Sequence, residues 1–332
     1  MKKVACFFFL FLISGMLSAQ NTIGLPRVKN YNRDDYKAGR QVWTIVQDSS
    51  KRIYCGNNEG LLVFNGNRWE QYSLPNQTCI RAILPRDGRI YVGGENEIGY
   101  FVPNEQGKLI YHTLTPIFDA LFPKFAVVWK IEYFNGSLFF QCRNVIFEYN
   151  GNAVKKYTSP NVKWHIIKST GGRLFAQDIS TGLYRFNGKT WELLLQNSST
   201  GFQISGIATI GKDSVIIASE HDGLYLLQYN RLSEMKCEVS PLLREHYISS
   251  LINVNDSLLV AGTVSAGCIF FNKKGIISQQ ISKKEGLQDN SVLTVQADTE
   301  GNIWTGLHNG ISCIAFNSAF KYIKPNKEND FA

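Results

Sequence analysis

The chain is built from short apolar runs that alternate with polar turn residues. The runs are rich in β-branched and aromatic residues and are bounded by Gly, Asn, Asp or Pro, as in VWTIVQD, RIYCGN, GLLVFNG and RWEQYS. Runs of about five residues with this composition are typical of β-strands. No segment keeps a helical period, apart from a short stretch at residues 115–124. The pattern therefore predicts an all-β protein.

The same four-run unit returns seven times along the chain. Its first runs align at Val42, Cys79, Val128, Trp164, Ile204, Ile248 and Val292, and its second runs at Tyr54, Tyr91, Phe139, Phe175, Ile216, Leu259 and Trp304. The units are 36–49 residues apart. Four antiparallel strands at this period are typical of a propeller blade, and a ring of blades buries the faces that a single blade leaves exposed. We therefore predict a single seven-bladed β-propeller of four-stranded antiparallel blades over residues 41–325.

Turn residues occur at equivalent points of these units. Asn-Gly pairs, which favour the tight turns of β-hairpins, separate the third and fourth strands at 65–66, 150–151 and 187–188. The sequence does not decide which segment forms the strand that closes the ring. Residues 26–31 (PRVKNY), within the N-terminal segment 20–40, and residues 320–324 (FKYIK) compete for that position, and residues 326–332 form a polar tail.

The N-terminus predicts export. Lys2 and Lys3 precede an apolar run that ends in the small residues Ser18 and Ala19, which is typical of a secretory signal peptide over residues 1–19. The run is shorter than a spanning helix needs, although an uncleaved anchor stays an alternative. We therefore expect a periplasmic or secreted protein with no membrane span beyond the signal segment. The net charge of +8 is scattered along the chain, so we expect no nucleic-acid partner.

The last unit (GLQDNSVLTVQADTEGNIWTGLHNGIS, residues 286–312) resembles the two-component regulator propeller repeat of extracellular bacterial sensors. Residues 41–73 are similar to the opening of the subgroup that carries a triple-tyrosine domain after the propeller, and the resemblance covers roughly residues 24–322. It implies an extracellular sensor for a ligand that is often a carbohydrate, coupled to a histidine kinase or a transcription regulator. We expect this chain to be such a sensor without its output domains, working with a signalling partner protein or as a homodimer.

Catalytic and metal-binding motifs are absent from the sequence. We find no HExxH, GxSxG or phosphate-binding loop, and the segment 297–304 resembles the Asp-box of sialidases, which is a structural turn. The five histidines are spread over different units without metal-ligand spacing. Six cysteines follow the leader in no CxxC pattern, which favours free thiols, with at most one disulfide. We therefore expect no enzyme activity, cofactor or metal.

A ligand would bind where loops gather at one end of the channel. The loops between second and third strands and those between blades share one face of a propeller, and pockets form preferentially at such mouths. The candidate ligand-binding residues on these loops and at the entry of the first strands are Asn57, Asn58, Glu59, Glu95, Glu97, Arg143, Asp178, Glu220, His221, Asp222, His308, Trp129 and Trp164. The alternative for each is a turn or packing role. Two other functions stay open: an exported protein-interaction scaffold and, less favoured, a carbohydrate-active enzyme.

Overall fold

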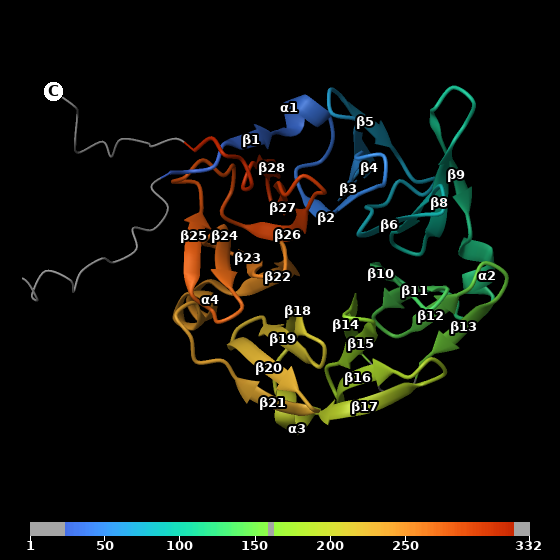
Figure 1. Ribbon diagram of the computed structural model, residues 1–332. Coiled ribbons are helices and arrows are strands. Elements are labelled where there is room, and N and C mark those ends of the chain that lie inside the picture. The colour runs from blue at the N-terminus through green and yellow to red at the C-terminus, as the bar shows by residue number, and fades with distance from the viewer. Residues whose placement is uncertain (1–23, 159–162, 322–332) are drawn as a thin grey trace, which may run out of the picture.

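The structure is a computed structural model that describes residues 24–158 and 163–321. The described residues form seven four-stranded antiparallel sheets. The sheets are arranged in a ring, as Figure 1 shows, and their inner strands line a central channel. The prediction of a seven-bladed β-propeller is confirmed. The predicted signal peptide, residues 1–19, and the polar tail, residues 326–332, lie outside the described residues.

Each blade runs from an inner strand at the channel to an outer strand at the rim. Blade 1 holds β2 (Val42–Gln47), β3 (Ile53–Asn57), β4 (Gly60–Phe64) and β5 (Trp69–Tyr72); blade 2 holds β6 (Ala82–Arg86), β7 (Arg89–Gly93), β8 (Ile98–Pro103) and β9 (Leu109–Thr113); blade 3 holds β10 (Val128–Phe134), β11 (Ser137–Cys142), β12 (Ile146–Tyr149) and β13 (Val154–Tyr157); blade 4 holds β14 (Trp164–Thr170), β15 (Arg173–Asp178), β16 (Gly182–Phe186) and β17 (Trp191–Gln196). Blade 5 holds β18 (Ile204–Gly211), β19 (Ser214–Ser219), β20 (Gly223–Gln228) and β21 (Arg231–Glu234); blade 6 holds β22 (Ile248–Asn253), β23 (Leu258–Thr263), β24 (Cys268–Asn272) and β25 (Ile277–Ile281); blade 7 holds β26 (Val292–Ala297), β27 (Ile303–Leu307), β28 (Gly310–Ile314) and β1 (Val28–Tyr31).

Strand β1 closes the ring from the N-terminal side. It pairs antiparallel with β28, so the outer strand of the last blade comes from the start of the chain. The Ser312 hydroxyl donates to Asn30 Oδ1 at 2.6 Å, and the Asn30 amide donates to the Gly286 carbonyl at 2.9 Å. Of the competing segment, Phe320 and Lys321 lie outside any strand, and 322–324 fall outside the described residues.

The core lies between the blades, where apolar side chains of neighbouring sheets pack face to face. Strands β3, β4 and β27 are buried at every position, because each is covered on both faces. The contact is close: a Cβ on Gly56 would lie 2.5 Å from the Ile80 carbonyl of the next blade. This close approach leaves no room for a side chain at Gly56.

The structure corrects the alignment of the units at two blades. The inner strand of blade 2 enters with Ile80, whose amide donates to the Asn57 carbonyl, so Ile80 takes the position assigned to Cys79. In blade 6 the residue equivalent to Tyr54 is Val260, one after Leu259. In both cases two adjacent apolar residues fit the same position, and the apolar pattern does not choose between them.

In the described residues, four short helices connect the strands: α1 (Arg33–Tyr36), α2 (Thr115–Asp119), α3 (Asn197–Thr200) and α4 (Ser240–His246). The helical stretch expected at residues 115–124 is shorter in the structure, because α2 ends at Asp119. Lys124, beyond the helix, has a left-handed φ of 53°. Within the described ranges, no helix is long and apolar enough to cross a membrane. The six cysteines that follow the leader are free, and burial raises the pKa of Cys268 and Cys313 to about 12.

Candidate ligand-binding site

A β-bulge at the start of the inner strands builds the channel mouth. The pairing of six inner strands skips one residue after the first, and that residue stands at the mouth. The corrected alignment adds Arg81 of blade 2 to the set, because its neighbours Ile80 and Ala82 match Val42 and Thr44. The seven equivalent residues are Trp43, Arg81, Trp129, His165, Ser205, Ser249 and Leu293.

A first arc of contacts runs along the mouth from blade 7 to blade 3. His308 Nδ1 lies 2.9 Å from the Gln41 amide nitrogen, and the Asn58 amide donates to Gln41 Oε1 at 3.0 Å. The Trp43 indole N–H donates to Asn58 Oδ1 at 2.6 Å.

The far end of the first arc is a stack of three side chains. The Arg81 guanidinium lies 3.7 Å from the ring centroid of Trp43 and 4.7 Å from that of Trp129. Such cation–π contacts contribute about 0.5–2 kcal/mol each, depending on solvent exposure. They fix the orientation of both rings, and Trp129 remains 40% exposed. The first arc therefore offers an oriented aromatic surface next to a cation.

A second arc spans blades 4 to 6. His165 Nε2 lies 3.1 Å from Glu220 Oε1, and His221 Nε2 lies 3.8 Å from Glu220 Oε2. The His221 ring meets Tyr247 edge-on at 4.4 Å between centroids. The hydrogen bond from His165 holds the pKa of the Glu220 carboxyl below its usual range. Tyr247 is half-exposed and has a φ of 52°, an unusual backbone conformation for an aromatic residue.

Three predicted site residues are buried in the frame of the mouth. Asn57 is fully buried and donates to the carbonyls of Gly39 and Gln41 at 2.6 and 2.9 Å. Asp178, at the equivalent position of blade 4, accepts from the backbone N–H of Ser180 at 2.8 Å. Trp164 is 6% exposed and matches Val42 instead of Trp43, so its ring packs between blades. These three side chains hold the loops in place and do not face the mouth.

The remaining predicted residues lie on loops between strands. Glu97 accepts from the Tyr111 and Thr113 hydroxyls at 2.7 and 2.8 Å, which turns its carboxylate toward strand β9. Asp222 accepts from the Ser219 hydroxyl at 2.8 Å and stabilises its own loop. Among the predicted site residues, the exposed side chains of Glu59, Glu95 and Arg143 make no hydrogen bond or ion pair within the described part of the chain.

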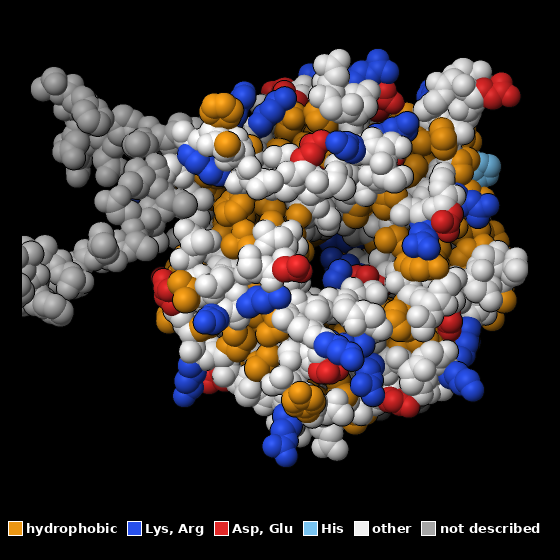
Figure 2. All heavy atoms as spheres, viewed as in Figure 1, with side chains coloured by type: hydrophobic (Ala, Val, Ile, Leu, Met, Phe, Trp, Pro, Cys, Tyr) orange, Lys and Arg blue, Asp and Glu red, His pale blue; other side chains and the backbone are white. Residues whose placement is uncertain are grey.

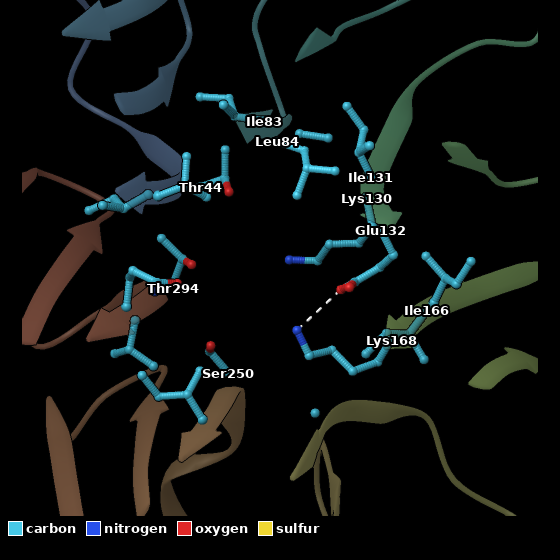
Figure 3. A pocket seen from close by; sticks show the side chains of 18 of the residues that line it. Thr44, Ile83, Leu84, Lys130, Ile131, Glu132, Ile166, Lys168, Ser250 and Thr294 are labelled. Atoms are coloured by element: carbon cyan, nitrogen blue, oxygen red, sulfur yellow. Dashed lines mark hydrogen bonds and ion pairs between the residues drawn. The ribbon is translucent and has the colours of Figure 1, made fainter. Parts of the chain in front are cut away.

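Below the mouth, the inner strands line a channel cavity of about 350 Å³. Figure 2 shows the channel as a hollow at the centre of the ring with basic and acidic side chains inside it. Three charged residues line it: Lys130 and Glu132 on β10, and Lys168 on β14. Lys168 Nζ lies 3.1 Å from Glu132 Oε1, as the dashed line in Figure 3 marks.

Sequence reasoning missed Arg81 and these three channel residues. Arg81 can be recognised as a site residue only from its contacts with Trp43 and Trp129, which belong to two other blades. The channel charges did leave a signal, because Lys130 and Glu132 alternate with apolar residues in a strand that lines the channel. Within residues 24–158 and 163–321, no group of three or more His, Cys, Asp and Glu side chains could hold a metal ion.

No protein-family model and no curated protein matches this chain. Among solved structures it is similar to two of the extracellular domain of BT4673 from B. thetaiotaomicron, described as a one component or a hybrid two component system. These share 21% and 22% identity, have TM-scores of 0.67 and 0.66, and cover 88% and 89% of this chain. The chain spans 40% of each of those structures.

Two further structures share the fold with lower identity. A streptogramin B lyase has 13% identity and a TM-score of 0.69, and covers 86% of this chain and 96% of its own. PorZ, a surface component of the type-IX secretion system of Porphyromonas gingivalis, has 14% identity and a TM-score of 0.63, and covers 83% of this chain and 46% of its own. At these identities the similarity shows the fold alone.

Proposed function

We propose that this chain is an extracytoplasmic sensor propeller of a bacterial signalling or transcription-regulatory system, and that it binds a small molecule or oligosaccharide at the channel mouth. The observation that carries the proposal is the pair of arcs around the mouth. They place aromatic rings, a guanidinium, an amide and a carboxylate around one opening.

The chemistry of the arcs fits a carbohydrate. Sugar rings stack on exposed aromatic faces, and their hydroxyls need donors and acceptors at fixed positions. The Trp43–Arg81–Trp129 stack supplies fixed rings, and the Glu220 carboxylate and Asn58 amide supply polar groups. Groups that are already oriented before binding lose little conformational entropy when a ligand arrives. The repeat motif and the BT4673 extracellular domains support the assignment to a sensor.

The alternatives have less support. A glycosidase needs a carboxyl group with a raised pKa as its acid, and the lowered pKa of Glu220 does not suit that role. We propose a role without catalysis. A scaffold needs a contiguous apolar surface. Among the ten large apolar side chains exposed in the described residues, Ile110, Leu193 and Ile276 belong to the outer parts of three different blades.

A thermal-shift screen of residues 20–332 against an oligosaccharide panel tests this proposal. A ligand that binds the folded state alone raises stability by about 2.7 kcal/mol at a concentration of 100 times its Kd. We expect a saturable shift with one class of glycan. Trp129→Ala should reduce the affinity for that ligand by tenfold or more, since it removes the exposed stacking face at the mouth.

Leu193→Ala on β17 is the matched control, because Leu193 is 45% exposed and far from the mouth on an outer strand. It should leave the shift unchanged. A folded protein that shifts with no glycan, or a ligand whose affinity is equal in wild type and Trp129→Ala, would refute the proposed function.

A further inference from the structure

Below the mouth, hydrogen-bond donors from several inner strands lie at one level of the channel. None of them takes part in the contacts of the mouth. Pairing along the inner strands places Thr44, Lys130, Ser250 and Thr294 at equivalent positions, two residues below the first residue of each strand. All four line the same cavity. Figure 3 shows the Lys130 side chain reaching into the channel, with the three hydroxyl-bearing residues on the opposite wall.

Lys130 has no partner at this level. Its neighbour Glu132 lies one level deeper and is bonded to Lys168, and no ion pair or hydrogen bond of the Lys130 ammonium is found among the described residues. The Lys130 side chain is exposed, but the solvent that it contacts is that of the channel, whose walls enclose it. The hydroxyls of Thr44, Ser250 and Thr294 likewise make no hydrogen bond to the described part of the protein.

The methyl groups of the two threonines explain why their hydroxyls stay free. The Thr44 methyl packs against Gly56 and the Thr294 methyl against Gly306, the glycines opposite them on the second strands. Because the methyl group of each threonine packs against the sheet, its hydroxyl group is free to face the channel.

We propose that this level of the channel is a binding site for a small oxyanion, the carboxylate, phosphate or sulfate group of a ligand, with Lys130 as its counter-ion and the three hydroxyls as further donors. The two lysines and one glutamate give the cavity a net charge of +1, which an anion would neutralise. Charge-assisted hydrogen bonds from an ammonium are stronger than neutral ones, and hydroxyls can turn their protons toward an oxygen. The site does not depend on the mouth binding a ligand.

Without an anion, the surroundings of Lys130 hold its pKa below the usual range. Desolvation lowers it, the nearby Lys168 ammonium lowers it further, and Glu132 opposes both. These are the charged groups that line the cavity. A bound anion stabilises the charged ammonium, so anion affinity should fall as pH rises toward the ordinary lysine pKa of 10.5.

Isothermal titration calorimetry of residues 20–332 with acetate, inorganic phosphate, sulfate and glucuronate tests the site. We expect saturable binding of at least one probe, and the four probes show which oxyanion fits. Lys130→Met should reduce that affinity roughly tenfold or more, the effect of losing a charge-assisted hydrogen bond. Lys130→Gln is a second variant that keeps a polar end should Lys130→Met fold poorly.

The matched control is the double variant Glu132→Gln/Lys168→Met, which removes the deeper ion pair and keeps Lys130. It should retain the affinity within a few fold, because it leaves the net channel charge at +1. Absence of binding by all four probes overturns the proposal. So does binding that survives in both Lys130 variants. Neither result bears on glycan binding at the mouth, which Trp129→Ala tests separately.

Discussion

Replacing Tyr31 should open the contact that closes the ring. Tyr31 is 7% exposed on β1 of blade 7, and its ring lies 5.3 Å from both Phe64 and Trp69 of blade 1 and 5.9 Å from Trp304. Truncating a large buried aromatic residue to Ala costs about 3–5 kcal/mol, because the transfer energy is lost and a cavity remains. Tyr31→Ala should therefore lower the free energy of unfolding by that amount.

Equilibrium urea denaturation, followed by tryptophan fluorescence and circular dichroism, measures this change. Tyr229→Ala is the control, since Tyr229 is 76% exposed, and it should change the free energy of unfolding by less than about 0.5 kcal/mol. If Tyr31→Ala is as mild as Tyr229→Ala, then β1 does not carry the closure and the account of the ring is wrong.

Three other predictions concern the stability of the fold, and urea denaturation checks each of them. Asn57→Ala should cost about 1–3 kcal/mol, because two carbonyls before β2 lose a buried donor. Gly306→Ala should be destabilising, since its Cβ would lie 2.6 Å from a blade 1 carbonyl, whereas Gly211→Ala should be near neutral, with no contact closer than 3.9 Å. The lowered pKa of Glu220 adds stability above its unfolded pKa that is lost as pH falls through the folded pKa, so the destabilisation by Glu220→Gln should shrink as pH falls below the ordinary value of 4.5. Equal effects for the two glycine variants, no effect of Asn57→Ala, or a pH-independent Glu220→Gln would each count against the corresponding argument.

The fold could be predicted from the sequence because its signals are local and repeat. Apolar runs, Asn-Gly turns and a recurring period each point to the same four-stranded unit. The exact register could not be predicted in two blades. Second strands are buried on both faces and lose the alternation that fixes register elsewhere, and at the start of an inner strand two adjacent apolar residues fit the same position. Cys79 and Ile80, or Leu259 and Val260, are equally apolar, and a bulge that shifts the count leaves no mark in composition.

The site was harder to predict because its contacts join distant blades. The sequence placed His221, His308 and Trp129 on the mouth, but gave no reason to separate Trp164, which is buried one position earlier in its strand. Arg81 was overlooked, since its two aromatic partners are far away in the chain and its own register was shifted by one.

Hydrogen–deuterium exchange with and without the glycan found in the thermal-shift screen tests the central claim most directly. If the mouth is the ligand site, the ligand should slow exchange in the loops at residues 57–59, 220–222 and 308–309 and at the start of β10. Exchange in the outer strands β9 and β17 should stay unchanged. Protection confined to an outer blade surface, with the mouth loops unaffected, would contradict the account.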